Sequence, residues 1–456
     1  MSLTTCTIHF SPRTDKTVYA TKELLKSLQL TGAKSVTLKL GSRSATVPIK
    51  VLKRTGKRLY VPDPVKSHLL IPRNGTCLIV SGPGKEVRFG PLIGILTNAS
   101  SSSVSQPFGA RTSLLKSFIR AGSDKSYYFA FMAKDVNWQD ETVTAYFPGN
   151  SGWVRKKVPL PDTVYNRLAS RAVDKSVTMN QFKERLIRRG IPLFNWSFFD
   201  KWDVYHLLED DPEVSRYVPE SHVNPSSERI KDMLEKYRFV YLKPTGGSLG
   251  IGIYRLTYHP RRGYFARFRR QGKNVLIRFG HFNDLMKMIS ARSGKLRNYL
   301  VQQGIRLIEL DSCPIDFRFH MHKNGQNEWV VAGIGAKKAG RGSVTTHVKN
   351  GGIVMTPEQA LHKVFGSDAE ATLQEAKKVA VKLAEAIERN GRYPLGELGL
   401  DIGIDQNGNI WMFEANSKPG RSIFKHPSLK EQGDASLAYI FEHSLYLSKF
   451  RTKGDA

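Results

Sequence analysis

The chain has 456 residues, of which 70 are Lys or Arg and 40 are Asp or Glu, so it carries a formal net charge of +30. This charge favours a polyanionic partner, such as a nucleic acid, an anionic surface layer or an acidic protein. Its length predicts two to four compact units. The chain has neither an apolar run near the roughly 20 residues that span a bilayer nor an N-terminal secretion signal. We therefore expect a cytoplasmic protein without a membrane span. The three cysteines, Cys6, Cys77 and Cys313, are odd in number and far apart, which argues against a disulfide framework or a zinc knuckle and favours buried thiols.

The first 88 residues alternate short apolar stretches with glycine, proline and basic turns. Strands are predicted at 36–40, 45–52 and 77–80, and the first two form a hairpin around Gly41 and Ser42. We therefore expect a β-rich N-terminal domain over residues 1–88, and we assign no site to it.

Residues 89–170 follow a different pattern. A buried strand over 90–97 precedes a serine-rich stretch, a helix near 113–121, a strand over 127–132 and a strand pair at 142–146 and 152–156. Strands that alternate with a helix in this order predict a small α/β domain.

The segment 239–253, FVYLKPTGGSLGIGI, combines an apolar strand, Lys243 and a glycine-rich loop. Lysine offers a point charge for phosphate, and glycines let backbone N–H groups approach an anion without a Cβ in the way. Because the lysine precedes the loop and no helix follows, the segment is not a P-loop. It still predicts a nucleotide site.

A strongly basic stretch comes next, over residues 254–278. It contains eight Lys or Arg and no acid, interleaved with five aromatic residues. Taken alone, this pattern is typical of nucleic-acid binding. Farther along, residues 357–389 place seven apolar side chains on one helical face that ends at Asn390 and Gly391, which predicts a helix packed on the core. A last helix is predicted over 435–450.

The segment 399–420, GLDIGIDQNGNIWMFEANSKPG, predicts a hairpin that carries three oxygen ligands. Two apolar strands, 402–405 and 410–413, flank a turn rich in Asn and Gly, which tolerate positive φ. Alternation lets Glu414 and Asn416 point the same way, and pairing brings Asp401 alongside Glu414. Oxygen ligands without His or Cys suit Mg²⁺, or Mn²⁺, completed by substrate phosphates.

Lys243, Pro244, the loop 246–250 and the triad Asp401, Glu414 and Asn416 together resemble the ATP-grasp superfamily of carboxylate–amine ligases over about residues 170–450. In detail they are most similar to the YheC/YheD family of endospore coat-associated ATP-grasp proteins. The segment 161–167, PDTVYNR, also resembles a signature of that family, and either a structural corner or a substrate contact would explain it.

The resemblance implies an α+β fold in which an ATP-grasp domain over residues 171–456 follows an N-terminal β-rich domain and a small α/β domain. The basic stretch 254–278, with a turn at Gly263, then falls in a lid at about 220–300. Its charge remains available for an anionic macromolecular substrate.

The resemblance also implies ATP and Mg²⁺ as cofactors, with Asp401, Glu414 and Asn416 as metal ligands. Phosphate contacts are expected from Lys201, Lys243, Gly246, Gly247, Ser248 and Gly250. A hinge at 299–305 is expected to hold the adenine through Gln302, Gln303 and Ile305, and Glu309 or Asp311 to hold the ribose.

Several basic residues are candidates for the chemical step. Arg318 could bind a carboxylate or phosphate through its planar fork, or form a structural pair with Asp316. Lys337, Lys338 or Arg341 could supply the cation for the transferred phosphoryl group. Asn350 and Arg421 are the expected substrate contacts.

The sequence therefore predicts a ligase that uses ATP to join a carboxylate to an amine as an amide, through an acylphosphate. The expected substrate is an amino acid or an acidic peptide, with a spore-layer polypeptide as the acidic partner. Two alternatives remain open: a catalytically silent ATP-binding protein of the spore coat, and a basic nucleic-acid-binding protein.

Overall fold

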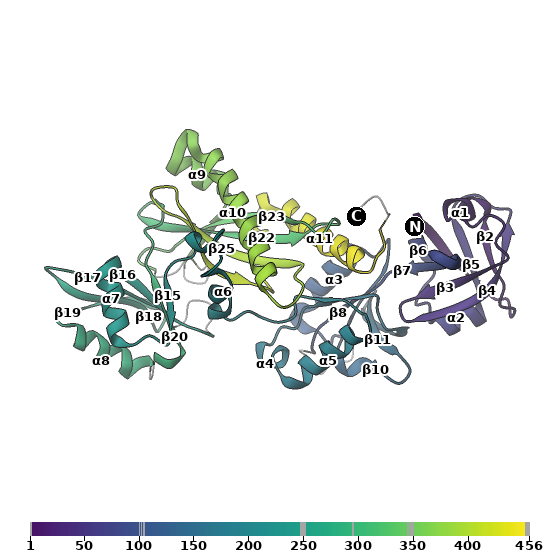
Figure 1. Ribbon diagram of the computed structural model, residues 1–456, viewed down its shortest axis with the longest axis horizontal. Coiled ribbons are helices and arrows are strands. Elements are labelled where there is room, and N and C mark those ends of the chain that lie inside the picture. Colours follow the sequence, from purple (N-terminus) through teal and green to yellow (C-terminus); the bar gives the residue numbers. More distant parts are fainter. Residues whose placement is uncertain are drawn as a thin grey trace.

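The chain folds into four β-sheets that lie along the long axis of the molecule, with the last sheet in the sequence placed between the second and the third (Figure 1). The computed structural model describes residues 2–99, 101, 103, 105–246, 252–293, 296–343, 346 and 351–451. Mixed helices and strands in separate layers confirm the predicted α+β class. Within the described ranges, no helix is both long and apolar enough to cross a membrane.

The N-terminal β-rich region is a closed barrel, with strands in the order β1-β5-β2-β4-β3-β7-β6. Its strands are β1 (Ser2–Ser11), β2 (Val18–Thr21), β3 (Ser35–Leu40), β4 (Arg43–Leu52), β5 (Arg58–Pro62), β6 (Gly75–Ser81) and β7 (Glu86–Gly90), with helices α1 (Lys22–Ser27) and α2 (Asp63–Leu69) packed against them. Side chains alternate between interior and surface, as a two-residue period requires. Cys6 and Cys77 face each other across β1 and β6, and both are buried free thiols, as predicted.

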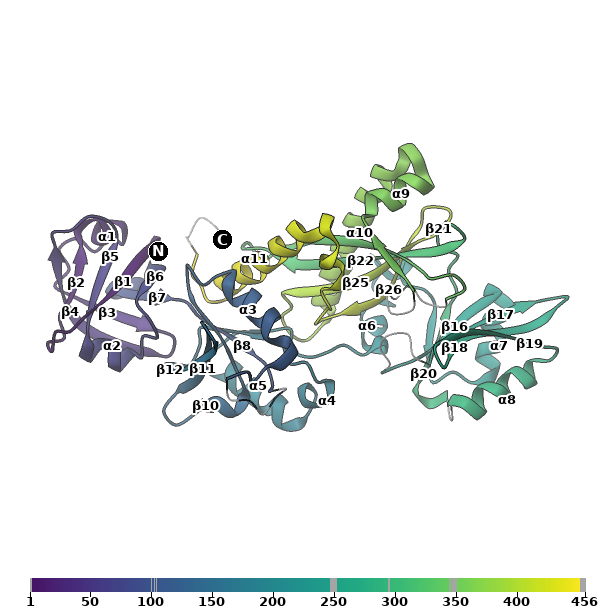
Figure 2. The same ribbon diagram turned by 180° about the vertical axis from the view of Figure 1, so that it is seen from behind.

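The second sheet has the order β10-β11-β9-β8-β13-β14, and β12 pairs with β11. Its strands are β8 (Leu92–Leu96), β9 (Tyr127–Phe131), β10 (Val136–Asn137), β11 (Thr142–Gly149), β12 (Gly152–Pro159), β13 (Thr163–Asn166) and β14 (Leu193–Phe194). Helices α3 (Thr112–Arg120) and α11 (Lys430–Leu447) lie on one side, and α4 (Arg171–Asp174) and α5 (Val177–Arg188) on the other (Figure 2). The sheet continues past residue 170, because α5 returns the chain to place β14 beside β13.

The third sheet, which we call the lid, spans residues 221–303 and is antiparallel in the order β15-β20-β16-β17-β18-β19. Its strands are β15 (Ser221–Val223), β16 (Phe239–Pro244), β17 (Tyr254–His259), β18 (Gly263–Arg270), β19 (Lys273–Phe279) and β20 (Tyr299–Gln303). Helices α7 (Ser227–Tyr237) and α8 (Phe282–Ser293) cover one face with a separate hydrophobic core. The turn expected at Gly263 is present, where φ is +76°.

The fourth sheet has the order β24-β23-β22-β25-β26, and β21 pairs with β22. Its strands are β21 (Glu309–Leu310), β22 (Cys313–Lys323), β23 (Trp329–Lys338), β24 (Ile353–Met355), β25 (Glu397–Ile404) and β26 (Ile410–Asn416). Helices α6 (Lys201–Leu208), α9 (Pro357–Phe365) and α10 (Ala369–Asn390) pack on one face, and α11 crosses the other. This helix therefore joins the fourth sheet to the second.

The predicted helix over 357–389 is two helices in the structure. α9 ends at Phe365, a short turn follows over Gly366–Asp368, and α10 begins at Ala369. Gly366 has a φ of +56°, a left-handed conformation that glycine adopts without a steric penalty. The apolar face that suggested a helix is nevertheless buried along α10, as expected for core packing.

Candidate active site

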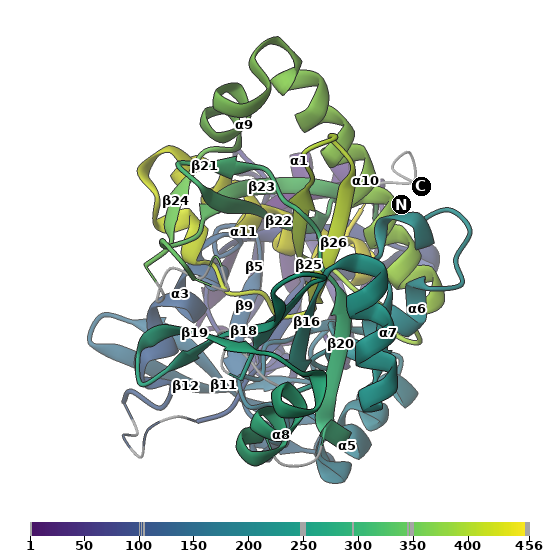
Figure 3. The same cartoon turned by 90° about the vertical axis from the view of Figure 1, so that its left-hand side faces the viewer.

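A cavity of 1540 Å³ lies between the lid and the fourth sheet. In Figure 3 the lid strands β16, β18 and β20 lie below β25 and β26. Residues from both sheets and from the hinge between them line the cavity; among the predicted site residues these are Lys243, Gln302, Ile305, Glu309, Arg318, Lys337, Asp401, Glu414 and Asn416. Residues far apart in the sequence therefore meet in one place.

The predicted hairpin carries Asp401, Glu414 and Asn416, the three predicted metal ligands, to the wall of this cavity. β25 and β26 are antiparallel, and Asp401 lies opposite Glu414, with a bulge before Ile402. The turn is closed by Asp405, whose Oδ1 accepts hydrogen bonds of 2.9 Å from the backbone N–H groups of Asn407 and Asn409. This local geometry holds the two strands in the register that the pattern predicted.

Asp401 is at the centre of a buried network of ion pairs. The Arg318 fork reaches both of its oxygens, at 2.8 and 2.7 Å, and Lys337 Nζ lies 2.9 Å from Oδ1. Lys337 also lies 2.9 Å from Asp316. Arg318 thus pairs with Asp401, and the alternative pair with Asp316 is not formed.

These contacts set the protonation of the two acids in opposite directions. Burial alone would raise the pKa of Asp401, but Arg318 and Lys337 hold that pKa well below its usual range. Burial raises the pKa of Asp316, and the neighbouring Asp401 adds to the effect, while Lys337 opposes it. Asp401 therefore stays ionised at neutral pH, as a cation ligand must.

The donors on the cavity wall fit a hard cation. Glu414 and Asn416 alternate along β26, so both side chains face the cavity while Ala415 is buried. The two carboxylate oxygens of Asp401 offer roughly four lone-pair positions. Three of them accept hydrogen bonds from Arg318 and Lys337, which leaves one for a cation. Within the described ranges, no group of three or more His, Cys, Asp or Glu forms a metal site. Two carboxylates and one amide suit Mg²⁺ that keeps waters and binds phosphate oxygens.

Lys243 is held in place by a hydrogen-bond chain that sequence reasoning did not find. Its Nζ lies 2.5 Å from Gln302 Oε1, and Gln302 Nε2 donates to Tyr205 and, at 3.1 Å, to Ser221. The Tyr205 hydroxyl in turn donates to the Phe413 carbonyl at 2.5 Å. The chain connects α6, the lid and β26. No local sequence pattern marks Tyr205, because its partners come from distant strands.

The hinge residues lie at the junction of β20 and the fourth sheet. The Gln303 backbone N–H donates to the Glu220 carbonyl at 2.8 Å, and its side chain accepts from Glu220 N at 3.1 Å. Ile305 and Glu309 line the cavity. Asp311, the other ribose candidate, forms an exposed ion pair with Lys338 at 2.8 Å. Of these two acids, Glu309 is the one on the cavity wall.

Four other predicted residues, Gln303, Arg421, Arg341 and Gly246, do not line the cavity. Arg421 donates to the Gly433 carbonyl at 2.7 Å and to Ser436 at 2.5 Å, so its guanidinium is turned toward α11. Arg341 and Gly246 are exposed and do not line the cavity. Lys201 is the first residue of α6. The predictions for Gly247, Ser248, Gly250 and Asn350 fall outside the described residues.

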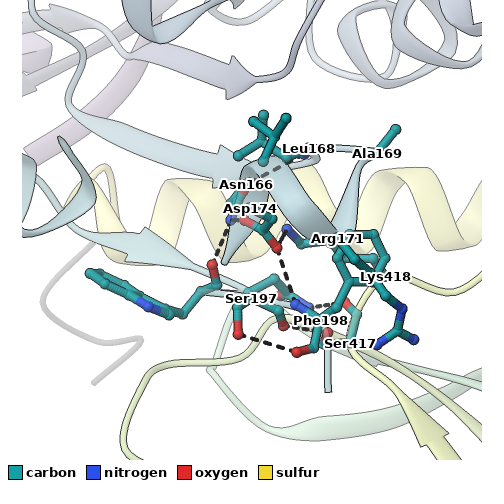
Figure 4. Close-up of polar contacts among 12 residues, drawn as sticks. Asn166, Leu168, Ala169, Arg171, Asp174, Ser197, Phe198, Ser417 and Lys418 are labelled. Atoms are coloured by element: carbon teal, nitrogen blue, oxygen red, sulfur yellow. Dashed lines mark hydrogen bonds and ion pairs between the residues drawn. The ribbon is translucent and has the colours of Figure 1, made fainter. Parts of the chain in front are cut away.

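A buried charge cluster fixes the chain just after β26 to helices α4 and α5 beside the second sheet (Figure 4). Lys418 lines the cavity, and its Nζ lies 2.6 Å from Asp174, which also accepts from Lys183 at 3.3 Å and from Asn166 at 3.0 Å. Burial lowers the pKa of Lys418 to about 7, although Asp174 opposes that change. The sequence offered no signal for this cluster, whose members look like ordinary surface charges.

Comparison with known proteins places these features in a family. Residues 190–447 match the family model described as YheC/D-like ATP-grasp. The chain is 37% identical over 369 residues to the endospore coat-associated protein YheD of Bacillus subtilis strain 168, covering 80% of each chain. It is 26% identical over 303 residues to the endospore coat-associated protein YheC of the same organism, covering 63% of this chain and 79% of YheC.

Among solved structures, D-alanyl-alanine synthetase A from Vibrio cholerae O1 aligns with a TM-score of 0.47 and 13% identity, over 79% of this chain and 99% of that chain. The family match spans the lid, the fourth sheet and the cavity between them. It confirms the ATP-grasp fold that the sequence predicted.

Proposed function

The chain belongs to the YheC/D-like ATP-grasp family, and on that premise we propose that it is an ATP-dependent carboxylate–amine ligase. ATP would transfer its terminal phosphoryl group to a carboxylate, giving ADP and an acylphosphate. An amine would then attack the acyl carbon, forming an amide and releasing phosphate. The observation that carries the proposal is the convergence of three cations, Lys243, Arg318 and Lys337, with two acids and an amide in one cavity.

The proposed roles follow from the charge that such a transfer must handle. Phosphoryl transfer depends on positioning and on neutralising the negative charge of the triphosphate. Asp401, Glu414 and Asn416 would hold Mg²⁺, which when bound would supply part of that neutralisation. Lys243, kept in position by Gln302, would contact the phosphates. The phosphate roles of Lys201 and of the loop 246–250 remain part of the proposal.

Arg318 and Lys337 are proposed as the cations that meet the transferred phosphoryl group. Arg318 uses two of its five N–H groups on Asp401, and Lys337 uses two of its three on Asp401 and Asp316. Both retain donors for an anion while they stay anchored. Such preorganised donors stabilise a transition state without having to reorganise during the reaction. Ile305 and Glu309, which line the cavity, are proposed to hold the nucleoside.

The reaction is tested by incubating the protein with Mg²⁺-ATP and a panel of amino acids and acidic peptides. ADP release and the mass of any conjugate are measured together. A conjugate formed with stoichiometric ADP supports the ligase. ADP without a conjugate indicates only an ATPase, and ATP binding without ADP release would favour the catalytically silent spore-coat alternative.

We expect Lys243→Ala to weaken ATP binding by on the order of tenfold or more, the value of one charge-assisted contact. Lys201→Ala should have the smaller effect, because Lys243 lies on a core strand and is held by Gln302, whereas Lys201 begins a helix. Titration calorimetry measures both, with the exposed Lys287→Ala on α8 as the control. Unchanged affinity in both variants would remove the phosphate role from the two lysines.

One of the two substrates, the carboxylate or the amine, is further proposed to be an acidic polypeptide. The support is the net charge of +30 and the basic stretch 254–278 of the lid, which contains no acid. A spore-layer protein is the expected source, because the relatives YheD and YheC are named endospore coat-associated proteins. Attraction between exposed charges is screened beyond about 8 Å at physiological ionic strength. Binding of such a substrate should therefore weaken with salt.

We expect the KM for an acidic peptide to rise at least severalfold between low and high salt, while the KM for ATP changes little. Replacing Arg267, Arg269 and Arg270 of β18 by Ala should flatten the peptide's dependence, because these side chains supply part of the attraction. Steady-state kinetics at several salt concentrations gives both constants. If both are flat with salt, or if only small amino acids are joined, the charge serves another purpose.

A further inference from the structure

The lid presents one strongly basic face that is not covered by its helices. Along β17, β18 and β19, alternate side chains are buried against α7 and α8, and the others point to the opposite face. That open face carries Arg255, Arg267, Arg269 and Arg278. Arg255 also lines the cavity, so the basic face begins at the proposed active site.

The arginines of this open face are not neutralised within the described parts of the chain. Among the described residues, no ion pair involves any of these four arginines; along the chain, the pairs on either side of them are formed by Lys236 and Lys287. Arg255 lies directly opposite Arg267, a cross-strand pair of like charges that is destabilising by itself. Arg255 Nε is buried and has no hydrogen-bond partner among the described residues. An anionic ligand would relieve both conditions.

The aromatic residues of the same segment argue against stacking of a single-stranded nucleic acid. Tyr254, Tyr264 and Phe268 are at most 9% exposed and belong to the core beneath α7 and α8. They do not offer flat rings for stacking bases, and of the aromatic residues in this segment only Phe265 shares the open face with the arginines. Single-stranded nucleic-acid sites stack successive bases on several such rings. Apart from Phe265, the aromatic residues of the pattern that suggested nucleic acid thus lie on the face opposite these arginines.

The outer edge of the lid is a strand with one side open. In the described sheet, β19 pairs with β18 alone. An edge strand presents N–H and C=O groups that can pair with another extended chain. Leu276 on this strand is 56% exposed, and it continues the row that runs from Arg255 through Arg267.

The start of β19 leads toward the cavity. The Asn274 side chain donates to the Arg341 carbonyl at 3.5 Å, in the loop that follows β23. β23 ends with Lys337, which lines the cavity, and Lys338. A chain extended along β19 would therefore pass from the lid edge to the side of the cavity where Lys337 and Asp401 lie.

We infer that β19 is the docking strand for an extended acidic polypeptide, which adds to the lid by backbone hydrogen bonds and places its alternate carboxylates beside the arginines of the open face. The inference rests on the proposed function for its purpose, since it says how the acidic substrate is presented. It is tested by binding alone, without ATP, so that failure to dock and failure to turn over are distinguishable.

The probe is a peptide of five alternating Glu-Thr pairs. In an extended chain all its Glu side chains lie on one face, all its Glu amides point to one edge and all its Thr amides to the other. Two forms are N-methylated, one on every Glu amide and one on every Thr amide, which leaves the charge unchanged. We expect one form to bind at least tenfold more weakly and the other to bind like the parent. Equal affinity of all three, or equal loss in both, would overturn strand pairing.

Hydrogen exchange locates the contact. The parent peptide should protect the amides of residues 273–279, and duplex DNA should not. Protection confined to other segments, or protection by DNA with no effect of the peptide, would overturn the inference, the second in favour of nucleic acid.

A matched pair of variants separates placement from net charge. Arg269→Gln with Arg278→Gln removes two charges from the open face, and Lys378→Gln with Lys382→Gln removes two exposed charges from α10. The lid variant should bind the peptide at least tenfold more weakly, and the α10 variant within about twofold of wild type. Equal losses would mean that the peptide senses only total charge, which contradicts a defined docking strand.

Discussion

Glu414→Gln is expected to lower the rate of amide formation by at least about 10²-fold while leaving the fold intact. The two side chains have nearly the same shape, so no cavity opens on β26, but the change removes one of the two carboxylates proposed to hold Mg²⁺. Loss of one such electrostatic contact typically lowers kcat by about 10²- to 10³-fold. Because Asp401 already shares its oxygens with Arg318 and Lys337, it cannot replace the missing ligand.

The measurement combines conjugate formation with thermal unfolding. Mg²⁺-ATP should raise the Tm of the wild type, since a ligand that binds only the folded state stabilises it. The Glu414→Gln protein should keep the Tm of the ligand-free wild type and lose most of the rise with Mg²⁺-ATP. Glu385→Gln, an exposed change on α10, is the control for charge loss. Turnover equal to wild type in Glu414→Gln would remove the metal role from this residue.

The hairpin could be predicted because its signals are local. The period-two pattern of β25 and β26 and the Asn-Gly turn lie within about 20 residues, and together they fix which side chains share a face. The strand that carries Lys243 was found for the same reason. Both predictions depend only on neighbours in the sequence, which is where such patterns carry information.

The partners of these residues could not be predicted, because they are distant in the chain. Lys243 and Gln302 are 59 residues apart, and Lys418 and Asp174 are 244 apart. Nothing local distinguishes Asp174 from an exposed acid on a short helix. The basic segment of the lid shows the converse error: its aromatic residues and arginines are mixed in the sequence. Only the sheet reveals that Tyr264 and Phe268 are buried on one face, while Arg267 and Arg269 lie with Phe265 on the other.

The buried cluster has a consequence for the cavity beside it. Lys418 follows Asn416 by two residues, and Ser417 between them donates to the Ser197 carbonyl at 2.6 Å. Arg167 also donates to the Pro419 carbonyl, at 2.7 Å. The end of the proposed metal-binding strand is therefore held by residues of the second sheet, of α4 and of the segment that follows β14. This accounts for the PDTVYNR segment as a structural corner, since Asn166 and Arg167 are among the residues that hold it.

Asp174→Asn is expected to destabilise the protein by about 3–5 kcal/mol, the usual cost of leaving a buried charge without its partner. Asp174, Lys183 and the Lys418 side chain are at most 2% exposed, so water cannot take over the lost contacts. Asp140→Asn breaks the exposed pair with Lys157, where Asp140 is 47% exposed, and should cost less than about 1 kcal/mol.

Because a chain with four sheets need not unfold in a single step, urea unfolding is combined with hydrogen exchange of α4 and α5. Both measurements should show a large loss of stability in Asp174→Asn and a small loss in Asp140→Asn. Adding Lys418→Met should recover part of the loss, since an apolar side chain removes one unpaired charge and fills similar space. Two outcomes would show that the cluster does not hold the strand. One is a loss of stability in Asp174→Asn no larger than that in Asp140→Asn, and the other is a double variant that is less stable than the summed effects of Asp174→Asn and Lys418→Met predict.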